Sequence, residues 1–482
     1  MSAKNILFVG AEIMPFAATG GLGDVLGSLP AAIKAELGEE GDVRAVMPLY
    51  SAVSDAWRAK MTKVMEFDMW LSWRNQYCGV YSLVKDGVTF YFIDNEYYFS
   101  RKALYGEYDD GERYAYFCKA VLEMLCRMDW KPDVLHAHDW QGAMSIVYLC
   151  RKYRLVEGFY GIKTVYTIHN IEYQGKYDTN ILSDVFEMDW ADMGLMEYGG
   201  CINLMKAAIV CADRVNTVSP RYAEELLGGE NAHGLSHILN VYAYKFSGIL
   251  NGIDYEYYNP HSDPAIVEKY NSTTAVEGKT VNKLALQKAT GLPERGDVPM
   301  VALITRLATH KGLDLVAEVA ASLLREDIQL VVLGKGEEKY ERFFLELEAR
   351  FPDKMKALIQ YDRDLSKRIY AAADVFMMPS KSEPCGLSQM IASRYGAVPV
   401  VRETGGLYDS IKPYWEKDGE MLGNGFTFAG YSGAELHERT CAAIDLYKQT
   451  AKWKKLVAKV MRTDFSWSAS AAKYLEMYDE LK

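Results

Sequence analysis

Two patterns of apolar residues alternate along the chain. Short apolar runs predict buried β-strands, and stretches with apolar residues three or four positions apart predict amphipathic helices. This alternation is typical of α/β folds built on parallel sheets. In the first half we expect strands at 6–9, 43–47, 134–137, 165–168 and 215–218, and helices at 23–36 and 114–128. In the second half we expect strands at 300–304, 329–333, 375–378 and 398–401, and helices at 314–325 and 366–373.

The strand–helix pattern stops and begins again near the middle of the chain. The intervening segment 247–260 carries turn-forming sequence around Asn251 and Gly252. A chain of 482 residues is also too long for one ordinary core. We therefore expect one domain at 1–249, a second at 250–462, and a terminal segment at 463–482 that forms a docking helix.

Composition and charge make some classes of binding partner and some kinds of site improbable for this chain. The net charge of −11 disfavours nucleic acid, because phosphate backbones are bound by basic surface. No apolar run approaches the roughly 18 residues of a membrane span, and the N-terminal apolar stretch is too short for a signal peptide. The eight cysteines are scattered without a CxxC pair, which favours packed thiols over a disulfide framework or a zinc site. We expect a cytoplasmic protein without membrane association.

A short glycine motif occurs twice, once in each half. Thr19-Gly20-Gly21-Leu22 returns as Thr404-Gly405-Gly406-Leu407. Glycines after a parallel strand let backbone N–H groups approach a phosphate, and a following helix N-terminus favours negative charge. The repetition suggests two domains that share one cleft. A chance match of four residues is the alternative, and a single Gly pair is most often a tight turn.

Two cations follow the expected strand 300–304. Arg306 and Lys311 lie five positions apart in the loop after it. Transfer of a sugar from a nucleoside diphosphate develops negative charge on the leaving group, and two fixed cations stabilise that charge without a metal. The alternative is a solvated loop. Asp362-Arg363-Asp364 has the form of a metal-binding DxD, but its position before 366–373 favours a turn and helix cap.

Further polar residues follow other strands. Glu383 comes after the strand at 375–378, where a carboxylate can hold sugar hydroxyls. Cys385 has no evident base partner, so we interpret it as a packed or backbone-positioning residue rather than a nucleophile. In the first half His138 and Asp139 end one strand, and His169 ends the next. A metal site is conceivable there but lacks further ligands, and a lone histidine is more often structural.

Taken in order, these motifs resemble those of bacterial glycogen synthases and plant starch synthases, glycosyltransferase family five. The resemblance covers essentially the whole chain, and EPCGL and LNGID in this order are highly specific. The matching segments are 19–25, 136–140, 167–170, 212–220, 250–254, Arg306 with 311–314, 379–387, 404–407 and 464–467.

The resemblance implies an α/β protein of GT-B fold, with two Rossmann-like domains facing each other across a deep cleft and a C-terminal helix returning to the N-terminal domain. It also implies retaining, metal-independent transfer of glucose, without a cofactor, to the non-reducing end of an α-1,4-glucan. The usual bacterial donor is ADP-glucose, with UDP-glucose left open, as is the oligomeric state. Retention without an obvious second carboxylate favours same-face attack over the double displacement of glycosidases.

The resemblance assigns roles residue by residue. Arg306 and Lys311 would hold the diphosphate, Glu383 would contact the donor glucose, and Tyr361 would lie near the adenine. The implied catalytic residues are Arg306, Lys311, Glu383, His169 and Asp139. The implied donor-binding residues are Gly20, Gly21, Asn251, Tyr361, Cys385, Gly386, Leu387, Thr404, Gly405 and Gly406, the last two through backbone amides. The implied acceptor-side residues are Asp24, His138 and Asn170.

One position departs from the family pattern. Ala18 stands where the family has a lysine before the first Thr-Gly-Gly. Loss of a preorganised charge of this kind costs roughly 10²–10³ in turnover. Three interpretations are open: Arg101 or Lys102 substitutes for the missing lysine, the donor or acceptor preference differs, or the chain is a weakly active or glucan-binding homologue.

The main alternative enzyme activity is that of another GT-B glycosyltransferase that makes a small sugar product. Ile391 occupies the place of a second Glu found in related GT-B enzymes, which favours family five over the sucrose-phosphate and trehalose-phosphate synthases.

Overall fold

The computed structural model describes residues 4–481, which divide into two compact units. Unit 1 comprises Met1–Gly252 together with Trp467–Lys482, and unit 2 comprises Ile253–Ser466. The chain thus passes into unit 2 once and returns for its last helix. The first break lies three residues beyond the boundary at 249 that the turn-forming sequence predicts.

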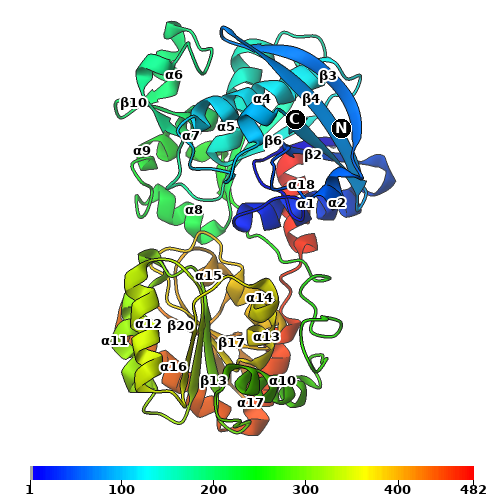
Figure 1. The fold of residues 1–482 in the computed structure, drawn as a ribbon. Helices are drawn as coiled ribbons and strands as arrows, with labels where there is room; N and C mark the ends of the chain where they lie inside the picture. Colours follow the sequence, from blue (N-terminus) through cyan, green and yellow to red (C-terminus); the bar gives the residue numbers. More distant parts are fainter. Residues whose placement is uncertain (1–3, 482) are drawn as a thin grey trace. The chain divides into compact units, whose positions relative to one another are not determined.

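Unit 1 is built on a nine-stranded sheet, in the order β12-β11-β7-β6-β1-β2-β5-β4-β3 (Figure 1). Its strands are β1 Asn5–Val9, β2 Asp42–Pro48, β3 Thr62–Leu71, β4 Arg74–Lys85, β5 Val88–Asp94, β6 Val134–His138, β7 Lys163–Ile168, β11 Arg214–Thr217 and β12 Phe246–Gly248. A separate small sheet contains β8 Lys176–Tyr177, β10 Cys201–Asn203 and β9 Glu197–Tyr198.

The sheet of unit 1 is parallel except at one edge. Strands from β12 to β5 pair in parallel, but β3, β4 and β5 pair antiparallel. Turns of two residues join them, and such turns only connect antiparallel neighbours. Ser72, Asp86 and Gly87 in these turns have positive φ, as tight hairpins require.

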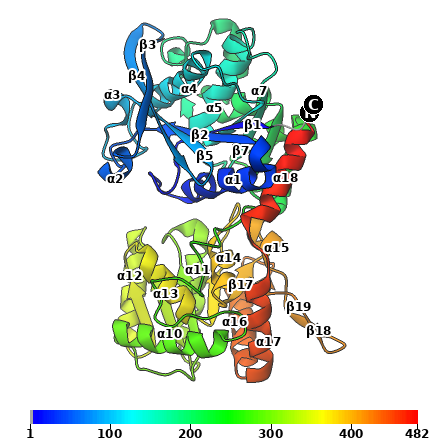
Figure 2. The same cartoon turned by 90° about the vertical axis from the view of Figure 1, so that its right-hand side faces the viewer.

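The helices of unit 1 include α18, which the last residues of the chain supply. They are α1 Gly21–Leu37, α2 Asp55–Arg58, α3 Glu96–Phe99, α4 Asp110–Cys126, α5 Asp139–Tyr148, α6 Met193–Met196, α7 Leu204–Cys211, α8 Pro220–Leu227, α9 Ser236–Val241 and α18 Trp467–Asp479. Helix α18 packs against α1, as both views show (Figures 1 and 2). The terminal sequence therefore forms a docking helix, as its periodicity predicts.

Helix α18 also completes the hydrogen bonds of buried polar groups in the sheet. The hydroxyl of Thr167 donates to Asn216 Oδ1 at 2.6 Å and lies 2.6 Å from His136 Nε2. Because that hydroxyl proton is already committed, Nε2 of His136 carries the ring proton and donates to it. Nδ1 of His136 then accepts from the hydroxyl of Tyr478 at 2.7 Å. Without α18 this buried ring nitrogen would lack its partner, which costs free energy of folding.

Unit 2 is a six-stranded, wholly parallel sheet in the order β15-β14-β13-β16-β17-β20. Its strands are β13 Met300–Ile304, β14 Gln329–Leu333, β15 Met355–Leu358, β16 Val375–Met378, β17 Val398–Arg402 and β20 Phe426–Phe428, with a hairpin of β18 Trp415–Lys417 and β19 Glu420–Leu422. The predictions for 300–304, 329–333 and 375–378 are confirmed to the residue. Figure 2 shows the hairpin projecting from the unit.

Helices cover both faces of the unit 2 sheet (Figure 1). They are α10 Ala275–Thr290, α11 Leu313–Leu323, α12 Glu338–Arg350, α13 Arg363–Ala372, α14 Ser388–Arg394, α15 Gly405–Ser410, α16 Gly433–Tyr447 and α17 Thr450–Arg462. Because the central strands are buried on both sides, they read as continuous apolar runs in the sequence.

Within residues 4–481, no helix is both long and apolar enough to cross a membrane. All eight cysteines are free; Cys78, Cys118 and Cys385 are buried, while Cys126 is exposed. The expectation of packed thiols therefore holds for some of the cysteines and fails for Cys126.

Candidate functional site

The candidate residues gather at the carboxyl ends of parallel strands in each unit. In unit 2 they follow β13, β16 and β17, and in unit 1 they follow β1, β6 and β7. Carboxyl ends of adjacent parallel strands meet at one edge, where open α/β sheets bind ligands. We describe the two groups separately, as the unit 2 cluster and the unit 1 cluster.

An ion pair between Lys311 and Glu383 is the centre of the unit 2 cluster. Nζ of Lys311 lies 2.9 and 2.7 Å from the two carboxylate oxygens of Glu383. The hydroxyl of Ser380 donates to the same carboxylate at 2.9 Å. Glu383 is buried, and Lys311 is largely so. Three hydrogen bonds from two donor groups thus fix one carboxylate after the end of β16, ready to accept further hydrogen bonds from hydroxyl groups.

Close backbone packing brings these two residues together. Gly312, directly after Lys311, has φ of 70°, and a Cβ there would lie 2.0 Å from the carbonyl oxygen of Pro379. Only glycine allows the loop after β13 to lie against the loop after β16. Glycine is therefore required after Lys311 because the two loops pack so closely.

Arg306 differs from Lys311, although the sequence suggests that they act as a pair. Its side chain is exposed and makes no hydrogen bond or ion pair with any described residue. It follows β13, the central strand of the sheet, so it lies at the same sheet edge as Glu383. The structure thus leaves Arg306 available to an anion, while Lys311 already neutralises a carboxylate.

The Gly405-Gly406 loop packs against the chain around Glu383. The N–H of Gly406 donates to the carbonyl oxygens of Glu383 and Pro384 at 3.1 and 3.2 Å. In this structure the amide donates within the protein, and its expected role toward a phosphate stays a prediction. Gly405 has φ of 45° and begins α15 after Thr404.

We predict that Gly406→Ala destabilises unit 2. A Cβ there would lie 2.0 Å from the carbonyl oxygen of Cys385, and backbone cannot yield as a side chain can. The expected loss in the free energy of unfolding is roughly 1–3 kcal/mol, measured by urea unfolding. The matched control is Gly20→Ala in the other copy of the motif, where an added Cβ meets nothing within 4 Å. Equal stability of the two variants would contradict this account.

The other expected donor-binding residues of unit 2 differ in their burial and in their contacts. Cys385 is buried, and the carbonyl oxygens of Cys385 and Gly386 accept from Gln389 Nε2 at 3.1 and 2.8 Å. Gly386 has φ of 68°, and Leu387 precedes α14. Tyr361 is 79% exposed, and its hydroxyl accepts from Arg363 Nε at 2.9 Å.

The interpretation of residues 362–364 as a helix cap is confirmed. Asp362 is the N-cap of α13, and its side chain accepts a hydrogen bond from the backbone N–H of Leu365 at 2.9 Å. Across residues 4–481, no group of three or more His, Cys, Asp or Glu side chains is arranged to hold a metal ion.

The unit 1 cluster contains His138, Asp139 and His169. Nδ1 of His138 lies 2.9 Å from Nε2 of His169, so one ring donates to the other. Asp139 begins α5 with φ of 51°, and its carboxylate accepts from the backbone N–H of His169 at 2.8 Å. Sparsely populated backbone of this kind is typical of functional sites. Nε2 of His138 is buried without a partner among the described residues.

Burial shifts the pKa values of the three side chains in this cluster. It lowers the pKa of His169 to about 3 and that of His138 well below its usual range, so both rings are neutral near pH 7. Burial raises the pKa of Asp139 to about 7, although hydrogen bonds from the backbone oppose the shift. Neutral histidines can donate and accept hydrogen bonds with hydroxyl groups, which suits recognition of a sugar.

We predict that Asp139 makes stability depend on pH. Its raised pKa means that the native state holds a proton that the unfolded state releases above about pH 4. Stability from this proton is present at low pH and is lost as the pH rises toward about 7. Relative to Asp139→Asn, the wild-type protein should lose about 1–3 kcal/mol across this window, measured by urea unfolding. Parallel curves for the two proteins would contradict the prediction.

Glu12 organises the first glycine loop, and no sequence pattern indicates this role. Its buried carboxylate accepts from the hydroxyl of Thr19 at 2.8 Å and from the N–H of Gly20 at 3.1 Å. The hydroxyl of Tyr105 also donates to it. A Cβ added at Gly20 or Gly21 would meet no atom within 4 Å, whereas one added at Gly405 or Gly406 would lie 2.0 Å from a carbonyl oxygen. The two copies of the motif therefore lie in different environments.

The remaining expected residues of unit 1 have mainly local contacts. Asn170 Oδ1 accepts from the N–H of Glu172 at 3.0 Å, which closes a turn after β7. Asp24 lies in the first turn of α1. Asn251 is buried, and its Oδ1 has no partner among residues 4–481. A buried, unpaired acceptor of this kind is costly unless a ligand or water completes it.

Comparisons with known proteins agree in both halves of the chain. A family model for the starch synthase catalytic domain matches residues 5–241, and a model for glycosyl transferases group 1 matches residues 287–459. A glycogen synthase of Lactobacillus acidophilus is 46% identical over 480 residues, 99% of each chain. One of Geobacillus stearothermophilus is 45% identical over 479 residues, 99% of this chain and 98% of the relative. These curated relatives are named as synthases, so the alternative of a glucan-binding homologue gains no support.

Solved structures are similar over the same extent. The catalytic domain of starch synthase IV from Arabidopsis thaliana, bound to ADP and acarbose, matches with a TM-score of 0.91 and 34% identity, over 100% of this chain and 99% of that one. A sucrose-phosphate synthase from Thermosynechococcus elongatus matches with a TM-score of 0.62 at 17% identity, over 99% and 98% of the two chains, which bears on the fold alone. The expected GT-B fold is thereby confirmed.

Proposed function

Because this chain belongs to the family of glycogen and starch synthases, which are glycosyltransferases, we propose that it transfers glucose from ADP-glucose to the non-reducing end of an α-1,4-glucan. Retention of the anomeric configuration and independence of metal ions are parts of the proposal. A cytoplasmic location is also proposed, because eight free thiols suit a reducing compartment.

The observation that carries this function is the geometry of the unit 2 cluster. A sugar donor needs a cation for its diphosphate and an acceptor for its hydroxyls, and this cluster holds Arg306 and Glu383 at one sheet edge. In the proposed reaction the bond from the glucose C1 to the phosphate oxygen breaks, and a bond from C1 to the acceptor oxygen forms on the same face. The leaving phosphate takes the acceptor proton, so the products are ADP and a glucan longer by one glucose. Arg306 stabilises the charge that develops on the leaving phosphate.

Lys311 is proposed to contact both Glu383 and the diphosphate of the donor. It now neutralises Glu383, and the same ammonium group can face the diphosphate when the donor is bound. The unit 1 cluster is proposed to bind hydroxyl groups: His169 those of the donor glucose, and Asp139 with His138 those of the acceptor. The lowered pKa values of His138 and His169 keep both rings neutral, and the raised pKa of Asp139 lets its carboxyl group hold a proton, which suits hydrogen bonding to sugars.

The test of this function is nucleotide release from ADP-glucose and UDP-glucose, each with and without glycogen and in the presence of a chelator. We expect ADP release that depends on glycogen, and a lengthened glucan as product. Release from UDP-glucose alone would overturn the choice of donor. Release with a small sugar acceptor but not with glycogen would overturn the choice of acceptor. No release from either donor would overturn the proposal as a whole.

Ala18 gives a separate prediction. Ala18→Lys should raise turnover or donor affinity at least roughly tenfold, because it restores a preorganised cation beside Gly20. Of the two candidate substitutes, Arg101 is already paired with Asp109 at 2.8 Å, while the exposed Lys102 makes no ion pair within residues 4–481. Initial rates over a range of ADP-glucose concentrations measure the effect.

The control for this variant is Ala59→Lys, which adds the same charge at an exposed position elsewhere in unit 1. Lysine at 18 keeps the Cβ that lies against Gly23, so the fold should persist. Unchanged kinetics of Ala18→Lys would show that another residue already supplies the charge.

A further inference from the structure

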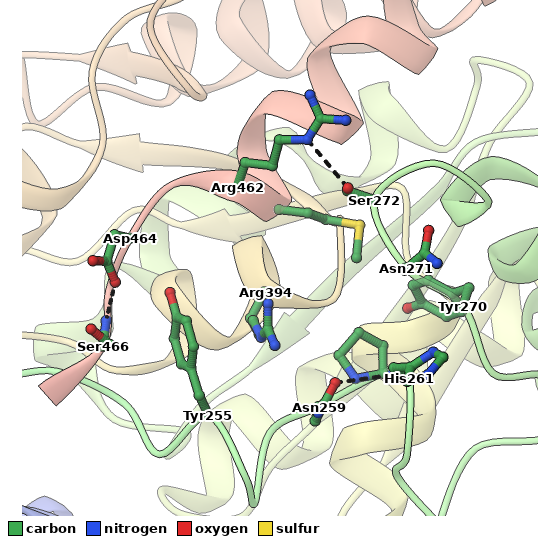
Figure 3. Close-up of a pocket in the computed structure, with 12 residues that line it drawn as sticks. Tyr255, Asn259, His261, Tyr270, Asn271, Ser272, Arg394, Arg462, Asp464 and Ser466 are labelled. Atoms are coloured by element: carbon green, nitrogen blue, oxygen red, sulfur yellow. Dashed lines mark hydrogen bonds between the residues drawn. The ribbon is translucent and has the colours of Figure 1, made fainter. Parts of the chain in front are cut away.

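Unit 2 contains a cavity of about 540 Å³, with several polar side chains in its wall, which the transfer reaction does not use. Its wall includes Tyr255, Asn259, Asn271, Arg394, Arg462 and Ser466, and we name it the crossover pocket (Figure 3). Its volume is within the range of roughly 300–1,000 Å³ that is typical of small-molecule sites.

The crossover pocket lies where the chain enters and leaves unit 2. The first residues of the unit, from Ile253, and its last residues, up to Ser466, both contribute to the wall or adjoin it. They are joined directly: the N–H of Ile253 donates to the carbonyl oxygen of Phe465 at 2.8 Å, and the hydroxyl of Tyr255 donates to the carbonyl oxygen of Thr463 at 3.2 Å. A ligand in this pocket would contact both connecting segments at once.

Two arginines supply positive charge to the pocket. Arg394 is stacked over the ring of Tyr255, 4.3 Å from its centre, and its Nε donates to the carbonyl oxygen of Tyr258 at 3.3 Å. Arg462 donates through Nε to the hydroxyl of Ser272 at 3.2 Å. The terminal nitrogens of both arginines make no hydrogen bond with any residue that the structure describes. Figure 3 shows Arg394 between Tyr255 and Asn271, with Arg462 above it.

The asparagines add further donors. Oδ1 of Asn259 accepts from the N–H of His261 at 3.1 Å, and Oδ1 of Asn271 accepts from the N–H of Thr273 at 2.9 Å. These bonds fix the orientation of each amide and leave its NH₂ group without a partner in residues 4–481. The only carboxylate in the wall, that of Asp464, caps the N–H of Ser466 at 2.8 Å. Unused donors therefore exceed acceptors, and the pocket suits a ligand rich in acceptor oxygens.

We propose that the crossover pocket binds a phosphorylated sugar. Arg394 and Arg462 donate to the phosphate oxygens, since guanidinium groups match phosphate geometry and form charge-assisted hydrogen bonds. The amide and hydroxyl groups of the wall bind the hydroxyls of the sugar, and the cavity has room for both parts. The inference does not depend on the transfer reaction proposed above, because it uses none of the residues assigned to that reaction.

The test is calorimetric titration of the full chain with glucose 6-phosphate, inorganic phosphate and glucose. We expect glucose 6-phosphate to bind and glucose not to bind. The double variant Arg394→Gln/Arg462→Gln should bind it at least about tenfold more weakly. Arg306→Gln, which alters the donor cluster, and Arg342→Gln, on the exposed face of α12, should bind it as the wild-type chain does.

A second variant keeps the test valid if the double variant folds poorly. Asn271→Asp changes one exposed amide to a carboxylate, retains the acceptor for Thr273, and should weaken binding through charge repulsion. Undiminished binding by both pocket variants, or loss of binding in Arg306→Gln alone, would overturn the proposal. Equal affinity for inorganic phosphate would overturn the sugar as ligand, and absence of binding by any probe at millimolar concentration would overturn the pocket.

Discussion

Replacement of Glu383 by glutamine should reduce turnover in glucosyl transfer by about 10²–10³. The variant keeps the shape of the side chain but removes its charge. Lys311, now 2.7 Å from the carboxylate, would lose its counter-ion in a largely buried setting, which is costly. The glutamine would also present an NH₂ group to Lys311 or to Ser380, both of which are donors. Initial rates at saturating ADP-glucose and glycogen give the measurement.

The matched control is Glu348→Gln. Glu348 is also paired with a lysine, since its carboxylate lies 2.6 Å from Nζ of Lys356, in a pair that is more exposed than that of Glu383 and Lys311. That pair lies near the start of β15, the opposite end of the strand from the candidate site. The control should lose stability to a similar or smaller extent and retain its turnover. Turnover of Glu383→Gln within about threefold of wild type would remove Glu383 from the proposed site.

The second large effect is expected from Arg306→Gln. We predict that kcat/KM for ADP-glucose falls by about 10²–10³, because Arg306 is the cation best placed to meet the charge of the leaving diphosphate. The exposed side chain makes no hydrogen bond or ion pair with described residues that would be lost, so the thermal midpoint should not change. A change in catalysis without a change in stability separates a direct role from a structural one. ADP affinity, measured by calorimetry, should weaken in parallel.

Arg342→Gln is the control for Arg306→Gln. Its side chain is 71% exposed on α12, so it tests the loss of one surface charge alone. Unchanged kcat/KM and unchanged ADP affinity in Arg306→Gln would show that Lys311 alone meets the diphosphate. The diphosphate site of this chain would then contain one residue fewer than the family resemblance implies.

Local chemistry explains what the sequence by itself determined. Strands β13 and β16 consist of apolar, largely buried residues throughout, and β14 does so after Gln329, so their apolar runs mark the strands closely. Asp362 caps α13 through a bond to a residue three positions away, which is a local property of the chain. The motifs after these strands therefore identified the edge of the sheet, the residues on it and the family.

Only the tertiary structure decided which of those residues act together. Lys311 and Glu383 are separated by 72 positions, and their pairing depends on a backbone contact at Gly312 that no sequence pattern reports. Glu12 lies seven positions before Thr19, and its carboxylate also accepts a hydrogen bond from Tyr105, which is 93 positions away in the sequence. The two glycine motifs read alike, yet one faces open space and the other faces a carbonyl oxygen. Local patterns specify elements and their ends, whereas contacts between distant loops depend on how the sheets bring those ends together.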